Sequence, residues 1–278
     1  MPLAPLDTAP LFRPLLDELL SLLRALDAEQ WQRPTVAGAW RVRDVAAHLL
    51  DGELRKLAAY RDGHVVPPDA PIASDRDLAR LVNGLNALGV QWAARLSPRL
   101  VTDLLAVTGA WMAELLETLD PHAPALWPVS WAGERESANW MDTGREYTER
   151  WHHQMQIRDA IGAAPVLLAP RWMLPLLDLS MRALPVGYAA VDAPDGAVVA
   201  FRVEGETSGA WSRVRDAGRW VVEPGRVGTP ATTVRATPDA AWRLLYNALP
   251  DPAHADGLTI VGDASLAAPL LRTRSVIV

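Results

Sequence analysis

Apolar residues recur at intervals of three and four positions along the first two thirds of the chain. This spacing places them on one face of an α-helix, so the pattern predicts a series of amphipathic helices. The clearest stripe lies in residues 42–60 and consists of Val42, Val45, Ala46, Leu49, Leu50, Leu54 and Leu57. The helices predicted in this way cover residues 10–26, 42–60, 75–96, 98–120, 140–162 and 171–184.

Local start and stop signals support several of these boundaries. Ser74 is followed three residues later by Asp77, which resembles a capping box at the start of a helix. Ser97 precedes Pro98, and proline is favoured at the first helical position because its missing N–H is not needed there. Gly162 is predicted to end the helix that begins near residue 140.

The pattern changes near Pro185, where short β-branched segments replace the helical stripes. Strands are predicted over residues 198–204, 211–215, 219–222, 232–235 and 258–262, and further helices over 238–245 and 264–271. Gly218 lies in the turn of a predicted hairpin. The sequence therefore predicts an α+β protein with two domains: an all-helical domain over residues 1–184 and a smaller α+β domain over residues 185–278.

Composition excludes several classes of function. The chain has 278 residues, of which 50% are hydrophobic, enough to form a core, and its net charge of −6 argues against a nucleic-acid partner. It has no cysteine, which excludes disulfides, cysteine-ligated metal sites and a cysteine nucleophile. No apolar run is long enough to span a membrane and the first residues lack a basic signal-peptide region, so a soluble cytoplasmic protein is expected. The sequence gives no indication of oligomeric state.

The helix predicted over residues 140–162 contains two metal-ligand side chains on one face. Glu149 and His153 are four residues apart, and a Glu-x-x-x-His pair can occupy two vertices of a tetrahedral zinc site. A catalytic zinc has three protein ligands, and His48 is the best third candidate because it borders the apolar stripe of its helix. His152 lies roughly 100° around the helix from His153 and does not share its face.

Two simpler interpretations of these residues stay open at this point. Glu146, Glu149, His153 and Gln156 form a polar stripe that is also typical of a solvated helix face. His48 alone is also compatible with a core histidine whose ring nitrogens are satisfied by hydrogen bonds.

Two segments resemble a known family. Trp40–Glu53 (WRVRDVAAHLLDGE) and Arg145–Gly162 (REYTERWHHQMQIRDAIG) are similar to the signature segments of the mycothiol-dependent maleylpyruvate isomerase family, within the DinB-like superfamily. Thr233–Leu245 and Leu258–Asp263 resemble the second domain of that family, which is related to sterol-carrier-like folds. The resemblance covers nearly the whole chain.

The resemblance implies a fold and a set of ligands. It implies an up-and-down four-helix bundle in which His48, Glu149 and His153 bind the metal, Zn²⁺ or another divalent transition metal. Many family members have Asp where this chain has Gln156, a position that can orient a ligand.

The resemblance also implies an activity. The expected enzyme uses a low-molecular-weight thiol such as mycothiol, whose metal-stabilised thiolate attacks a small electrophile. The outcome is thiol S-transfer, which we favour slightly because of Gln156, or cis–trans isomerisation of a maleylpyruvate-like compound. The alternative is a non-catalytic protein that binds a small molecule or lipid and has a structural or vestigial metal site.

Arginines near the two segments are candidates for polarising the substrate or the thiol. Arg145 and Arg41 are the two that we predict to act in this way, with Arg43 and Arg150 also nearby. The alternative for each is a surface or helix-packing arginine. Trp40 is likewise a candidate for a pocket wall or for a core residue.

Overall fold

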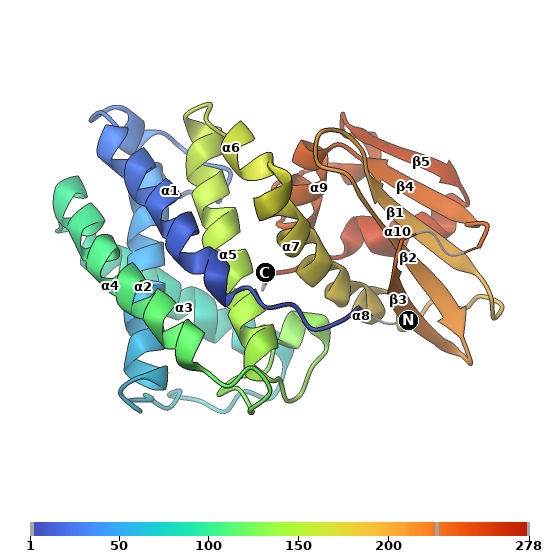
Figure 1. Ribbon diagram of the computed structural model, residues 1–278, viewed down its shortest axis with the longest axis horizontal. Coiled ribbons are helices and arrows are strands. Elements are labelled where there is room, and N and C mark those ends of the chain that lie inside the picture. Colours follow the sequence, from blue (N-terminus) through green and yellow to red (C-terminus); the bar gives the residue numbers. More distant parts are fainter. Residues whose placement is uncertain (1–2, 226–227, 277–278) are drawn as a thin grey trace. The chain divides into compact units, whose positions relative to one another are not determined.

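The computed structural model describes residues 3–225 and 228–276. Two compact units are present, coloured along the chain in Figure 1. Among the described residues, the helical unit consists of Asp7–Trp127 and Ala138–Ala164, and the sheet unit consists of 3–6, Pro128–Ser137, 165–225 and 228–276. The domain boundary at residues 184–185 stays a prediction, because compact units need not coincide with domains that fold alone.

A four-helix bundle forms the helical unit, as predicted. Its members are α1 (Phe12–Ala25), α2 (Val42–Tyr60), α4 (Pro98–Thr118) and α5 (Asn139–Ala160). Both α1 and α2 pack against α4 and α5, which closes a ring of four helices (Figure 1). Apolar side chains from these helices form one continuous core, among them Val45, Leu49, Leu50, Leu105 and Ile157. Burial of this face is the main stabilising contribution to the bundle.

The third predicted helix, over residues 75–96, lies outside this ring. It is α3 (Asp75–Ala93), which packs against α2 and buries only Gly89 and Ala93. Its N-terminus has the predicted cap, in which Ser74 Oγ accepts a hydrogen bond of 3.2 Å from the Asp77 backbone N–H. The cap of α4 is also confirmed, since Ser97 Oγ accepts a hydrogen bond of 3.2 Å from the Leu100 backbone N–H.

Gly109 is a point where the bundle helices approach closely. A Cβ atom at this position of α4 would lie 2.6 Å from Leu16 Cδ1 and 3.3 Å from Glu53 Oε1. Gly109→Ala is therefore expected to lower the free energy of unfolding by about 1–3 kcal/mol, although alanine favours helices. Urea unfolding measures this, with Gly84→Ala on α3 as control because nothing lies within 4 Å of its added Cβ. Equal stability of the two variants would contradict the packing argument.

The sheet unit contains a five-stranded sheet in the order β3-β2-β1-β4-β5. Its strands are β1 (Val198–Val203), β2 (Gly209–Asp216), β3 (Arg219–Pro224), β4 (Thr232–Ala236) and β5 (Leu258–Gly262). The β1–β4 pair is parallel and the other pairs are antiparallel, with β2 and β3 forming the predicted hairpin. In its turn Ala217 and Gly218 both have positive φ.

Five helices of the described residues belong to the same unit as the sheet. They are α6 (Pro165–Leu168), α7 (Pro170–Ser180), α8 (Leu184–Tyr188), α9 (Pro238–Leu245) and α10 (Ala264–Arg272). The single helix predicted over residues 171–184 is thus divided, with a 3₁₀ turn at Met181–Ala183. Pro185 explains the division, because it has no N–H to continue the α-helical hydrogen bonds. No helix among the described residues is long and apolar enough to cross a membrane.

Candidate metal centre

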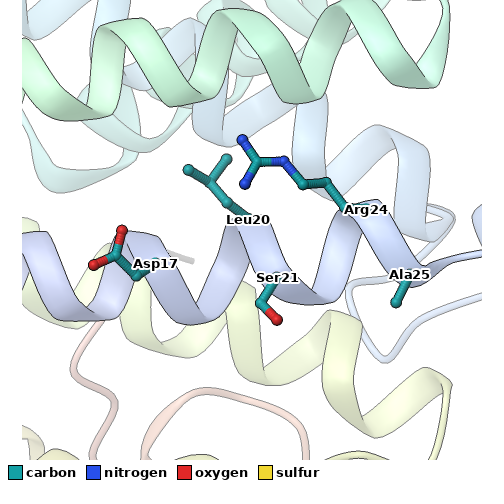
Figure 2. A pocket seen from close by; sticks show the side chains of 5 residues that line it. All are labelled: Asp17, Leu20, Ser21, Arg24 and Ala25. Atoms are coloured by element: carbon teal, nitrogen blue, oxygen red, sulfur yellow. The ribbon is translucent and has the colours of Figure 1, made fainter.

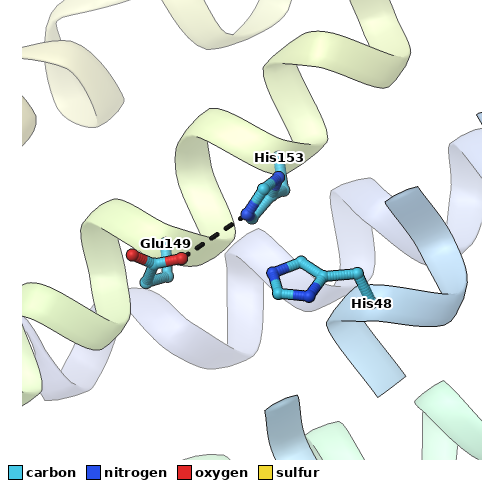
Figure 3. A group of neighbouring side chains, drawn as sticks. All are labelled: His48, Glu149 and His153. Atoms are coloured by element: carbon cyan, nitrogen blue, oxygen red, sulfur yellow. Dashed lines mark ion pairs between the residues drawn. The ribbon is translucent and has the colours of Figure 1, made fainter. Parts of the chain in front are cut away.

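The structure brings the three predicted ligands together. His48 projects from α2, and Glu149 and His153 project from α5 (Figure 3). One ligand atom from each lies within 4.8 Å of the other two. The contact between α2 and α5 in the bundle places them there, although about a hundred residues separate His48 from Glu149 in the chain. No fourth histidine, cysteine, aspartate or glutamate joins this group in the described part of the chain.

Hydrogen bonding orients the His153 ring. Its Nδ1 lies 2.9 Å from the Gln156 amide oxygen, and its Nε2 lies 3.5 Å from Glu149 Oε2 (Figure 3). An amide oxygen only accepts hydrogen bonds, so it favours the tautomer with the proton on Nδ1. The lone pair on Nε2 is then directed toward Glu149. Gln156 thus contacts the ring of a predicted ligand from the position at which the resemblance expects Asp.

Aromatic packing and burial define the surroundings of the donors. The Trp40 ring lies 5.1 Å from the His48 ring and 6.4 Å from the His153 ring, between centroids. His48 and His153 are each 8% exposed, whereas the Glu149 side chain is 30% exposed. Gln156 is also buried. The solvated-face interpretation of the polar stripe is therefore wrong for His153 and Gln156, and the centre is accessible on the Glu149 side.

Electrostatics keep the donors in the form that binds cations. Burial, with the neighbouring His153, lowers the pKa of His48 well below its usual value, so its ring is neutral at pH 7. Burial alone would raise the pKa of Glu149, but the adjacent His153 and His152 rings and Arg145 hold that pKa below the usual range. A neutral histidine and an ionised carboxylate are the forms that bind metals.

His152 is not part of the group. Its Nδ1 lies 2.8 Å from the Thr148 carbonyl oxygen, and burial lowers its pKa to about 3. Among the described residues, His152 does not join the group of donors, as its position on the helix predicted.

A buried charge cluster continues along α2 and α5 beyond the three donors. It consists of Glu53, Lys56, Asp142, Arg145, Glu146 and Arg150. Lys56 pairs with Asp142 and lies 3.5 Å from Glu146, and Arg150 lies 2.6 Å from Glu146. Sequence reasoning missed this cluster. The available signal was the position of Lys56, the only lysine, on the side of α2 that carries the apolar stripe.

The two predicted arginines have different surroundings. Arg145 donates from Nε to Asp142 Oδ1 at 3.0 Å and also pairs with Glu146, and its charge contributes to lowering the pKa of Glu149. Arg41 is exposed and donates to Gln32 Oε1 at 3.0 Å. The action of either side chain on a substrate or thiol stays a prediction.

A separate pocket lies over α1 (Figure 2). Its lining residues are Asp17, Leu20, Ser21, Arg24 and Ala25, all from that helix. None of them is a predicted site residue, so this pocket does not alter the assignment of the centre.

Removing the Gln156 acceptor tests its orienting role. Gln156→Leu is expected to weaken zinc binding by about 10–100-fold, because the His153 ring loses the partner of its Nδ1 proton. Competition with a chromophoric chelator measures the affinity. Gln156→Glu keeps an acceptor oxygen at the same reach and is expected to retain the affinity of the original protein. Similar affinities for the Leu and Glu variants would show that the hydrogen bond has no such role.

Comparisons with known proteins identify the family of the helical unit. The family model described as mycothiol maleylpyruvate isomerase N-terminal domain matches residues 12–158, which are more than half of the chain and include all three donors. A search of the curated proteins finds no match.

Two of the similar solved structures show the fold of the chain. The crystal structure of a mycothiol-dependent maleylpyruvate isomerase is 14% identical, with 92% of each chain covered and a TM-score of 0.53. A histidine-to-alanine mutant of that enzyme gives the same identity and coverage, with a TM-score of 0.51. A sterol carrier protein 2 like 2 from Aedes aegypti matches 34% of this chain at 20% identity, with a TM-score of 0.27. The chain belongs to the mycothiol maleylpyruvate isomerase N-terminal domain family.

Proposed function

We propose that the protein is a metal-dependent enzyme that uses a low-molecular-weight thiol, such as mycothiol, to attack a small electrophile. The observation that carries this proposal is the group of three donors, His48, Glu149 and His153, contributed by two packed helices. Three protein donors are typical of catalytic zinc sites, whereas structural sites have four. With three donors from the protein, a tetrahedral cation has one vertex left for an added ligand.

The donor set fits zinc or another divalent transition metal. Imidazole nitrogen and carboxylate oxygen are both ligands for such cations. Gln156 supports the fit, because it leaves Nε2 of His153 free to bind. When bound, such a cation lowers the pKa of an added thiol, so that the nucleophilic thiolate is present at neutral pH. The chain has no cysteine, so the sulfur must come from a small molecule.

The surrounding residues prepare the centre for this chemistry. The Trp40 ring packs near both histidine rings and forms one wall of the centre. The half-exposed Glu149 marks the side from which a thiol and an electrophile approach. Arg145, held by Asp142 and Glu146, is the candidate for polarising the electrophile, and Arg41 is a second candidate.

The proposed reaction class is addition of the thiolate to an electrophilic carbon. In an isomerisation, sulfur bonds to one carbon of an activated cis double bond, the resulting single bond rotates, and elimination of the thiolate restores a trans double bond. In an S-transfer, the new carbon–sulfur bond is retained and the product takes up a proton. A maleylpyruvate-like compound is the candidate substrate for the first outcome, on the likeness to the isomerase.

Metal and thiol binding together test this function. The purified protein is expected to hold about one equivalent of a transition metal and to bind mycothiol only when the metal is present. His48→Ala and Glu149→Ala are expected to remain folded and to lose both. His64→Ala, which changes an exposed loop histidine, is the matched control and should retain both.

Three outcomes would contradict the proposal. Full metal content in the His48→Ala variant would mean that the cation binds elsewhere. Ligand binding that survives removal of the metal, with no thiol-dependent turnover, would favour the non-catalytic alternative. Unfolding on removal of the metal, without thiol binding, would indicate a structural site.

A further inference from the structure

Two arginines lie on the same face of strand β2 in the sheet unit. Arg213 and Arg215 are two residues apart, so their side chains point to the same side of the sheet. Arg213 pairs in register with Val222 and Arg215 with Trp220, both on β3. Trp220 is buried, and Arg213 itself is only 1% exposed. A guanidinium group is thus held against the covered face of the sheet.

Neither arginine has the partners that a buried guanidinium needs. Arg213 donates from Nη2 to the Trp220 carbonyl oxygen at 2.7 Å, while its buried Nε and Nη1 have no hydrogen-bond partner. The buried Nε of Arg215 has none either. Among the residues 3–225 and 228–276, no carboxylate lies within ion-pair distance of Arg213 or Arg215. Asp178, a carboxylate that reaches this face, accepts a hydrogen bond from Trp211 Nε1 at 2.8 Å instead.

The remaining contacts of the two guanidinium groups are aromatic. Arg213 lies 5.4 Å from the Tyr188 ring centroid and 5.9 Å from that of Trp220, and Arg215 lies 5.9 Å from the Trp220 centroid. Aromatic faces attract cations, but they contribute less than the desolvation of a buried charge costs. Burial lowers the pKa of Arg213 to about 10, which leaves it protonated at pH 7. Two cations from the same face of β2 therefore lack a counter-charge among the described residues.

We propose that Arg213 and Arg215 bind a small oxyanion, a carboxylate or phosphate group, on the covered face of the sheet. An oxyanion would accept hydrogen bonds from the three unpartnered N–H positions and neutralise the buried charge. Arg215 is half-buried and stands next to the exposed turn at 216–218, which gives the anion a route of entry. This site is independent of the proposed enzymatic function, since it uses none of the metal donors.

Anion-dependent thermal stability of the full chain tests the proposal. The melting temperature is measured against phosphate and, separately, acetate, with chloride as the balancing salt at constant ionic strength. The original protein is expected to show a saturable rise of about 5 °C with the preferred anion. A response to phosphate alone identifies a phosphate site, and a response to acetate alone identifies a carboxylate site.

Variants separate an anion site from a purely structural arginine. Arg213→Met is expected to lose the saturable rise. In chloride, the melting temperature of this variant should equal or exceed that of the original protein, because an apolar side chain has replaced an unpaired buried charge. Arg213→Lys keeps the charge without the planar fork and should need about tenfold more anion. Arg219→Met changes an exposed arginine on β3 and should respond like the original protein. His48→Ala should also retain the full response.

The proposal would be overturned by either of two results. The first is the same anion response in the original protein and in Arg213→Met, which would reflect general salt effects. The second is the absence of a saturable response in the original protein, together with a lower melting temperature of Arg213→Met and Arg213→Lys at every anion concentration. Arg213 would then have a structural role, through packing and its hydrogen bond to the Trp220 carbonyl.

Discussion

Lys56→Met is expected to lower the free energy of unfolding by about 1–3 kcal/mol, because it removes one of the two cations that pair with the buried Asp142 carboxylate and leaves Arg145 alone to neutralise it. Lys56 and Asp142 are 3% and 2% exposed at their side chains, and they form a direct ion pair. Tyr60 also donates a hydrogen bond to Asp142, but a neutral hydroxyl does not replace the lost charge. Chemical denaturation at pH 7 measures the change.

A double substitution distinguishes loss of the ion pair from loss of packing. Lys56→Met combined with Asp142→Asn removes both charges, so it is expected to recover a large part of the stability that Lys56→Met alone loses. Glu146 keeps two other cations, Arg145 and Arg150, in either variant. If the double variant is no more stable than Lys56→Met, the loss comes from the lysine side chain's packing rather than from the weaker neutralisation of Asp142.

Glu53 is expected to make stability fall as the pH rises from about 5 to 8. Burial raises the pKa of its carboxyl to about 7, and the nearby negative charge of Glu146 raises it further. Arg150 and the hydrogen bond from Thr108 lower this pKa but do not cancel the effect of burial. Between the ordinary value near 4.5 and about 7, the folded state therefore holds a proton that the unfolded state has lost. This contribution is complete below the unfolded pKa and is lost as the pH rises through 7, by up to about 3 kcal/mol.

The Glu53→Gln variant isolates this contribution. Glutamine is neutral at every pH, so the stability difference between the original protein and the variant should shift by about 3 kcal/mol between pH 5 and 8. Metal-free protein is used, because metal binding is itself pH-dependent. His48 and His152 have lowered pKa values and act in the opposite direction, since stability rises as the unfolded chain loses their protons, but they do so equally in both proteins. A constant difference across this range would contradict the raised pKa of Glu53.

Much of the fold could be predicted because its local signals agree with its packing. The bounds of α2 match the prediction. Its long apolar stripe begins directly after Arg41, whose backbone N–H donates a hydrogen bond of 3.0 Å to the Asp44 carboxylate at the start of the helix. The hairpin of β2 and β3 follows from the glycine in its turn. The place of α3 outside the bundle could not be predicted, because its amphipathic pattern resembles that of the four bundle helices.

The candidate site was predictable only where spacing within a helix or a family pattern carried the information. Glu149 and His153 share a face of one helix, and the resemblance added His48 from another. Apart from the position of Lys56 on the apolar side of α2, the charge cluster gave no sequence signal, because burial of Glu53 and Asp142 depends on which helices become neighbours. The same residue types on an isolated helix would indicate a solvated face.

Because the three donors lie on α2 and α5, the stability of the folded protein would depend on the concentration of free metal. A cation held by His48, Glu149 and His153 would act as a removable cross-link that closes a loop of about a hundred residues, containing both α3 and α4. Global unfolding would require its release, so stability would rise with the logarithm of the free metal concentration above the dissociation constant. Cells short of the metal would then lose the protein to proteolysis as well as its activity.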